Sequence, residues 1–97
     1  MTTHVIVLSK PDPAKADGAR RYADAVQPLL KAAGVVPTLR APVAASVAGK
    51  ATPATVLVLE FTDEAAARGF FNQPAYRDLI PLRDDSFVHM EIHILGG

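Results

Sequence analysis

The chain contains no cysteine among its 97 residues. This absence excludes disulfide bonds, a thiolate nucleophile, iron–sulfur clusters and zinc sites built on cysteine. An excess of one charge is also missing, because ten basic residues balance ten acidic ones. Proteins that bind nucleic acid usually carry a basic excess on one face, so we expect no nucleic-acid partner.

Long apolar runs are missing as well. No run approaches the roughly 20 residues that a membrane-spanning helix needs, and the start of the chain, Met1 to His4, lacks the basic and apolar regions of a signal peptide. We therefore expect a cytoplasmic protein without a membrane partner. The chain also has no glycine-rich phosphate loop, no Gly-x-Ser-x-Gly turn and no His-Glu-x-x-His helix. Nucleotide hydrolysis, nicotinamide-dependent redox chemistry and serine hydrolysis thus find no support.

The residues that are present suffice for one compact domain. Hydrophobic residues make up 49% of the chain, and a chain of this length has room for one core, so we predict a single domain over residues 1–97. Pro37 and Pro42 restrict the segment that contains them to an edge strand or an irregular ribbon. Three further strands are predicted where short runs are apolar or alternate, at His4 to Ser9, Thr55 to Phe61 and Ser86 to Leu95.

Helices are predicted between these strands. After the first strand, apolar residues recur every three or four positions, which indicates an amphipathic helix that Gly34 closes. A second helix is expected after Thr62 as its N-cap, and a short one from about Ala75 to Ile80, ending before Pro81. The order of elements predicts an α+β ferredoxin-like βαββαβ sandwich with the helices on one face of an antiparallel sheet. The buried face of the second helix is expected to consist of Ala66, Ala67, Phe70 and Phe71.

The strands are apolar on both faces, although the helices of this architecture cover only one. In the first strand, Val5 and Val7 point one way while Ile6 and Leu8 point the other. An apolar face left in water usually marks an interface or a ligand groove. We predict that a second copy of the chain covers it, which makes the protein a homodimer. A different partner protein would satisfy the same physics.

Part of the sequence resembles a known family. The residues that carry the resemblance are Leu59-Glu60-Phe61-Thr62, Ala66, Phe70-Phe71, Pro74-Ala75-Tyr76 and Leu82-Arg83, and they are similar to the domain-of-unknown-function 1330 proteins of the dimeric α/β-barrel superfamily. The resemblance implies a homodimer whose two sheets pack together and enclose small pockets. Relatives in the wider superfamily include cofactor-free monooxygenases, lactone isomerases and polyketide-modifying enzymes. No catalytic residue set is carried over from the resemblance, and a shared fold does not identify a reaction.

The last predicted strand carries a row of polar residues. His89, Glu91 and His93 alternate along it, so their side chains leave the same face. Two imidazoles and a carboxylate suit acid–base chemistry or a divalent metal, whereas the structural interpretation is the wet face of a half-exposed strand. The alternate residues of this strand are expected to point into the helix-covered core, and they are Val88, Met90, Ile92 and Ile94.

Glu60 shares a face with Val56 and Val58, the face assigned to the dimer. A partly desolvated carboxylate needs a partner or a raised pKa. Glu60 is therefore either a general base in a pocket or the structural partner of an arginine such as Arg40 or Arg83. His4, at the start of the first strand, either points toward the same pocket or lies at a frayed terminus.

Further polar residues cluster in the short helical region. Tyr76, Arg77 and Arg83 lie close together in sequence there. Arg83, which precedes two aspartates, is interpreted first as part of a surface ion pair and second as an anchor for an anionic substrate. Tyr22 falls on the apolar stripe of the first helix and is expected to be a core residue with its hydroxyl at the rim.

These observations lead to one hypothesis and one alternative. The hypothesis is a homodimeric α/β-barrel protein that holds a small, largely apolar organic molecule between sheet and helices, and acts without a cofactor as an isomerase, cyclase or monooxygenase-like enzyme. The alternative is a non-catalytic binding or structural dimer module. No metal is expected. The candidate catalytic residues are His89, His93 and Glu60, and the candidate substrate-binding residues are His4, Arg40, Glu91, Tyr76 and Arg83.

Overall fold

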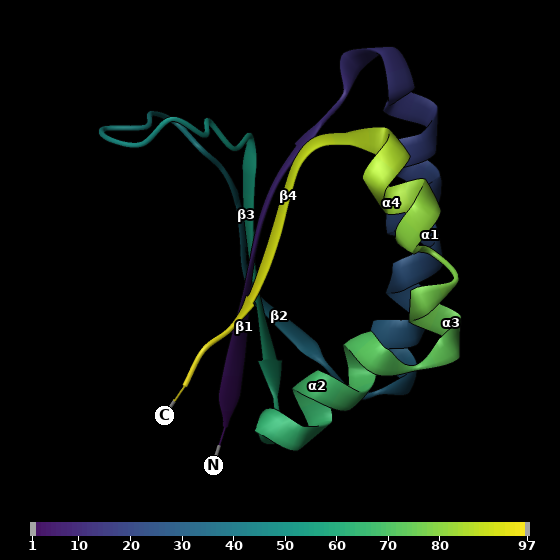
Figure 1. Ribbon diagram of the computed structural model, residues 1–97. Helices are drawn as coiled ribbons and strands as arrows, with labels where there is room; N and C mark the ends of the chain where they lie inside the picture. The colour runs from purple at the N-terminus through teal and green to yellow at the C-terminus, as the bar shows by residue number, and fades with distance from the viewer. Residues whose placement is uncertain (1, 97) are drawn as a thin grey trace.

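The computed structural model describes residues 2–96, which form a four-stranded sheet with helices on one face (Figure 1). No helix within these residues is long and apolar enough to cross a membrane. The strands are β1 (Thr3–Pro11), β2 (Val36–Pro42), β3 (Thr55–Phe61) and β4 (Phe87–Ile94). The helices are the short 3-10 helix η1 (Pro13–Lys15) and α1 (Ala16–Ala32), α2 (Glu64–Asn72), α3 (Pro74–Arg77) and α4 (Ile80–Ser86).

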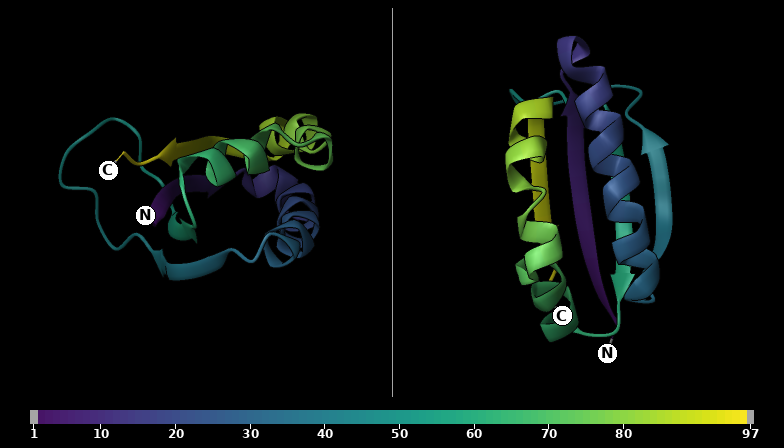
Figure 2. Two further views of the ribbon diagram at one scale, coloured as in Figure 1. Left: turned by 90° about the horizontal axis from the view of Figure 1, so that it is seen from below. Right: turned by 90° about the vertical axis from the view of Figure 1, so that its right-hand side faces the viewer.

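The sheet has the strand order β2-β3-β1-β4, and every neighbouring pair is antiparallel. The chain thus makes a β1-α1-β2 unit and then a β3-helix-β4 unit, with β1 and β3 in the centre. Figure 2 shows α1 running beside the shorter helices α2 to α4, all of them over the same face of the sheet. This arrangement confirms the predicted α+β ferredoxin-like fold.

The core lies between the sheet and the helices. Val5 and Leu59 of the central strands are buried there, as are Ala67 and Phe70 of α2. Tyr76, from α3, is the largest fully buried side chain of the described residues. Its ring lies 5.1 Å from that of Phe71, centroid to centroid, in an edge-to-face arrangement that aromatic pairs favour.

The end of α1 follows the prediction. Gly34 has a φ of +69°, a conformation that glycine adopts without the steric penalty of a Cβ atom. Its N–H donates to the carbonyl of Lys31 at 3.1 Å, and the N–H of Val35 donates to the carbonyl of Leu30 at 3.0 Å. These two bonds make a Schellman motif. The motif turns the chain toward β2 and buries Leu30 and Val35 together.

Several local predictions for the second half of the chain were wrong. The N-cap of α2 is Asp63 rather than Thr62, since the Asp63 carboxylate accepts a 2.7 Å hydrogen bond from the N–H of Ala66. Ala66 itself is exposed rather than buried. Pro81 lies in the first turn of α4 instead of ending a helix, because a proline in that position gives up no intrahelical hydrogen bond.

Val88 was also predicted wrongly. Pro11 pairs with Phe87 and Lys10 pairs with His89, so Val88 has no partner on β1 and the register shifts there. As a result, Val88 is 58% exposed, and the preceding Phe87 turns toward the helices, where its ring meets Tyr22 at a centroid distance of 5.5 Å. A bulge of this kind reverses the side on which a residue lies, and an alternating sequence does not reveal it.

Candidate functional site

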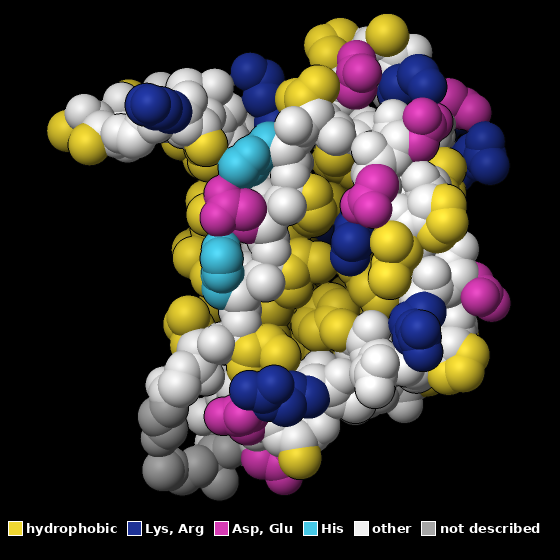
Figure 3. Space-filling model, in the orientation of Figure 1, with side chains coloured by type: hydrophobic (Ala, Val, Ile, Leu, Met, Phe, Trp, Pro, Cys, Tyr) yellow, Lys and Arg dark blue, Asp and Glu magenta, His cyan; other side chains and the backbone are white. Residues whose placement is uncertain are grey.

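A cavity of about 620 Å³ lies between the sheet and the helices. Figure 3 shows the hollow from one side, with hydrophobic side chains covering its interior. The strands present alternate residues to it, and α1 presents residues three and four positions apart. Its apolar floor is made by Val7, Leu57, Leu59, Met90 and Ile92. Its roof includes Ala19, Ala23, Val26 and Leu30.

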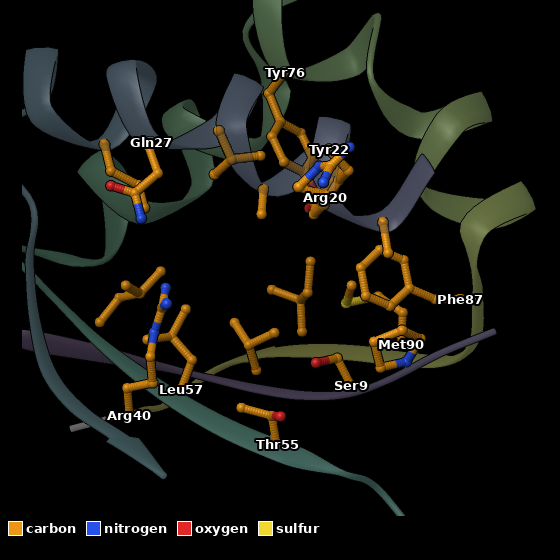
Figure 4. A pocket seen from close by; sticks show the side chains of 18 of the residues that line it. Ser9, Arg20, Tyr22, Gln27, Arg40, Thr55, Leu57, Tyr76, Phe87 and Met90 are labelled. Atoms are coloured by element: carbon orange, nitrogen blue, oxygen red, sulfur yellow. The ribbon is translucent and has the colours of Figure 1, made fainter. Parts of the chain in front are cut away.

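Few polar side chains reach this cavity. Figure 4 shows Arg40, Ser9 and Thr55 on the sheet side, and Gln27 and Arg20 on the side of α1. The cavity lining contains no aspartate or glutamate among the described residues. An apolar cavity with a small number of placed polar groups is the usual form of a site for a small organic molecule.

Two tyrosine hydroxyls meet at the wall of the cavity. Tyr22 Oη and Tyr76 Oη lie 2.7 Å apart and share a hydrogen bond. Arg83 Nη1 donates to Tyr76 Oη at 3.1 Å, and Arg83 Nε donates to a carboxylate oxygen of Asp84 at 3.1 Å. Arg83 does not line the cavity itself, so it acts on the cavity through Tyr76.

Burial raises the pKa of Tyr22, and the hydrogen bond with Tyr76 raises that pKa further. The phenol therefore stays protonated at neutral pH, because its ionised form would lose solvation and a hydrogen bond that the neutral form keeps. Tyr22 therefore offers a neutral hydroxyl group, and its partner Tyr76 already accepts a hydrogen bond from Arg83. Such groups suit hydrogen bonding to a polar atom of a ligand better than proton abstraction.

The opposite face of the sheet, called the open face below, carries a second group of candidate residues. The register places the following residues on it: His4, Ile6, Leu8, Val36, Leu39, Val56, Val58, Glu60, His89, Glu91 and His93. Ile6, Leu8, Val56 and Val58 form an apolar centre, flanked on the β4 side by the polar row. Glu60 has His4 as its partner, with Glu60 Oε2 3.7 Å from His4 Nε2. The predicted pairing of Glu60 with Arg40 does not occur, since Arg40 pairs with Leu57 and shares its face.

The row on β4 is a local group of close polar contacts. His89 Nε2 lies 2.5 Å from one oxygen of Glu91, and His93 Nε2 lies 2.9 Å from the other. In Figure 3 histidine side chains flank an acidic one at the edge of the sheet. The hydrogen bond with His93, followed by the close contact with His89, lowers the pKa of Glu91. No group of three or more His, Cys, Asp or Glu within residues 2–96 has an arrangement that holds a metal ion.

The structure thus divides the sequence-predicted residues between two faces. Arg40 and Tyr76 line the cavity, and Arg83 bonds to Tyr76. The open face holds the other predicted residues, which are His4, Glu60, His89, Glu91 and His93. The sheet separates the two groups, so a ligand in the cavity does not touch the second group.

The sequence analysis missed four polar residues of the cavity, Ser9, Thr55, Arg20 and Gln27. The last two come from α1. Both are exposed residues on α1, where long polar side chains are ordinary. Their spacing carried a signal: Arg20 and Gln27 are seven residues apart, and they flank Ala23 on the same helical face. That signal pointed to a polar rim along the apolar stripe.

The fold and register define a ferredoxin-like α+β protein whose helices stand over one sheet face. Within that class the chain belongs to the DUF1330 family (domain of unknown function), whose model matches residues 5–97. No curated protein matches the sequence.

Solved structures share the fold at low sequence identity. A protein of unknown function from Rhodopseudomonas palustris has a TM-score of 0.80 at 16% identity, and the match covers 99% of this chain and 82% of that one. A dimeric ferredoxin-like protein of unknown function from Jannaschia sp. CCS1 has a TM-score of 0.76 at 14% identity, with 100% of both chains covered. A Dabb family protein with a ferredoxin-like fold from Mesorhizobium loti has a TM-score of 0.68 at 14% identity, over 99% of this chain and 96% of that one. At such identities the likeness shows the fold.

Proposed function

We propose that the protein is a homodimeric α/β-barrel protein that binds a small, largely apolar organic molecule in the cavity between sheet and helices. The observation that carries the proposal is the cavity itself. Its volume of about 620 Å³ falls within the roughly 300–1,000 Å³ typical of small-molecule sites. Its apolar floor would take the body of the molecule, while the hydroxyls of Tyr22 and Tyr76 would bond to a polar atom.

The open face supports the homodimer. Ile6, Leu8, Val56 and Val58 are only half-buried, and adjacent Leu39 is 52% exposed. Contiguous apolar surface of this kind usually marks an interface. The solved proteins from Jannaschia, from Bacteroides fragilis and from Thermobifida fusca with this fold are described as dimeric.

The loop 43–54 lends further support to the homodimer. In Figure 1 it projects beyond the sheet on the side away from the helices. Its Val47 is fully exposed, at 100%. The start and end of the loop are held together by a 2.8 Å hydrogen bond from the N–H of Val43 to the carbonyl of Ala54. A second copy packed on the open face would cover this apolar arm.

Catalysis without a cofactor is the finer part of the proposal. For His89, His93 and Glu60 to act, the bound molecule would have to reach the open face, in a pocket that forms between two sheets. Proton transfer, isomerisation or oxygenation there would use the imidazoles as acid or base. The competing function is a structural dimer module. The apolar open face favours it, because dimerisation through that face requires no ligand.

The cavity can be tested with a neutral probe, 1-naphthalenemethanol, by titration calorimetry. In Ala23→Phe the new ring would occupy the cavity, because Ala23 lines it. We expect the affinity of this variant for the probe to fall by about tenfold or more, as lost apolar contact area predicts. Ala32→Phe is the matched control, since Ala32 is exposed on the same helix and does not line the cavity.

The result that contradicts ligand binding in the cavity is equal binding by the two phenylalanine variants, or no binding by the unchanged protein. Either would leave the structural dimer module as the better function.

A further inference from the structure

We infer that the cavity selects a small apolar organic anion, such as an aromatic or aliphatic carboxylate, and that Arg40 binds its anionic group. The inference rests on the proposed function and names the chemical class of the ligand. It follows from the charges that line the cavity, from their partners and from the direction of the Arg40 side chain.

The charged residues that line the cavity are all of one sign. Arg20 and Arg40 are its charged lining residues, and no carboxylate from residues 2–96 belongs to the lining. Arg20 is already compensated, because its Nη2 lies 2.7 Å from Asp17 Oδ1. Arg40, in contrast, has neither a salt bridge nor a side-chain hydrogen bond within the described part of the chain. The uncompensated charge at the cavity is therefore that of Arg40.

The register explains why Arg40 faces the cavity. The pairing of β2 with β3 shifts between Pro37 and Leu39, after which Arg40 lies opposite Leu57. Leu57 belongs to the cavity floor, so Arg40 shares the helix-covered face. Without the shift, alternation from Pro37 would place residue 40 on the opposite face. The irregularity in β2 thus places the Arg40 guanidinium over the apolar floor of the cavity.

Figure 4 shows Arg40 rising from β2 toward α1, where Gln27 extends toward it from the opposite wall. A guanidinium presents a planar fork of N–H donors that matches the two oxygens of a carboxylate. The Gln27 amide adds an N–H donor group from the helix side. An anion held there would place its apolar part over Leu57 and the rest of the floor.

A neutral ligand would use this site less well. Its polar group would leave the guanidinium without a counter-charge, whereas a carboxylate forms charge-assisted hydrogen bonds that are about twice as strong as neutral ones. Arg40 is exposed, so salt screens the attraction and the selectivity falls as ionic strength rises. An anion with an apolar body is therefore the class of ligand that uses both the floor and the arginine.

The test compares two probes of nearly equal shape, 1-naphthoate and the neutral 1-naphthalenemethanol. The chain has no tryptophan, so naphthalene fluorescence follows binding without interference from that residue. We expect the unchanged protein to bind naphthoate about tenfold more tightly than the alcohol at low salt, as a charge-assisted contact predicts. Arg40→Met is expected to lose that preference and to retain its affinity for the alcohol. The matched control is Arg21→Met, because Arg21 is an exposed arginine of α1 outside the cavity lining.

The outcomes separate the inference from the proposed function. If Arg40→Met binds naphthoate as well as the unchanged protein does, or if the alcohol binds as tightly as naphthoate, Arg40 does not select an anion. The cavity then remains a site for neutral molecules. If neither probe binds, both the inference and the proposed function fail. Retained binding of the alcohol by Arg40→Met shows that the variant is folded, so a lost preference reports on the charge alone.

Discussion

At the scale of single residues, the contact of Tyr22 with Tyr76 connects the core to the cavity. Both rings are buried, at 8% and 1% exposure, and their hydroxyls satisfy each other at 2.7 Å. Buried hydroxyls without partners cost stability, so this pair allows two large aromatic residues to fill the core. The predicted site residue Tyr76 is thus structural and a cavity wall residue at the same time.

The ionisation of Tyr22 has a consequence for stability at high pH. Its folded-state pKa is raised, first by burial and then by Tyr76, above the value of about 10 in an unfolded chain. Below pH 10 the phenol is protonated in both states and the full stability is present. As pH rises past about 10, the unfolded state releases its proton and the folded state does not, so the free energy of unfolding falls by up to about 1.4 kcal/mol per pH unit.

This loss can be measured by urea unfolding between about pH 8 and pH 11. Tyr22→Phe has no proton to release at this position. Its free energy of unfolding should therefore decline less steeply above pH 10 than that of the unchanged protein. Parallel pH profiles for the two proteins would show that Tyr22 ionises equally in the folded and unfolded states.

At the scale of elements, local sequence patterns predicted the strands and helices well, because each pattern acts within a few residues. β3 spans Thr55–Phe61, as its apolar run predicts, and Gly34 ends α1 through its own backbone freedom. The N-cap of α2 was missed by one residue because Thr62 and Asp63 are both good caps. Only the path of the chain decides which of the two side-chain oxygens meets the N–H of Ala66.

The role of Gly34 predicts opposite effects for two similar substitutions. Gly34→Ala places a Cβ atom on a residue with φ of +69° and should lower the free energy of unfolding by about 1 kcal/mol. Gly69→Ala, within α2 and with open space around its new Cβ, should raise it by about 0.5–1 kcal/mol through higher helix propensity.

Both changes can be followed by thermal and urea denaturation at neutral pH. The Gly69 variant serves as the control, because it makes the same chemical change in a helical backbone. A Gly34→Ala protein as stable as the unchanged one would mean that the Schellman motif contributes little to folding.

At the scale of the whole molecule, the main feature is the open face, because the helices cover the other face of the sheet and leave the apolar residues of the open face in contact with water. Leu8→Lys would place a charged side chain on central strand β1 within the apolar centre of that face. In a homodimer the lysine would be brought into an apolar interface, where an unpaired charge is costly. We expect the dimer to dissociate at concentrations where the unchanged protein stays dimeric, with its dissociation constant raised by about a hundredfold or more.

Sedimentation equilibrium of the two proteins measures this difference, with circular dichroism to check the fold of the variant. Ala66→Lys is the control, because Ala66 is exposed on α2, away from the sheet. A Leu8→Lys protein that remains as dimeric as the control would exclude the open face as the interface. If the unchanged protein is monomeric, the proposed homodimer is wrong, whereas the proposal that the cavity binds a ligand is not affected.

The sequence by itself determined the order of elements, the ferredoxin-like topology and the doubly apolar strands, since hydrophobic periodicity and end signals are local properties. It also identified Arg40 and Tyr76 as candidate binding residues. It also placed Glu60, His89 and His93 on the face away from the helices. It did not reveal that Arg40 lies on the helix-covered face, since that depends on the register of β2 against β3. The shift after Pro37 places Arg40 over the floor, and the bulge at Val88 turns Phe87 inward. The cavity was decided by tertiary structure alone, because its volume depends on how far the helices stand from the sheet, which is set by packing between residues distant in sequence.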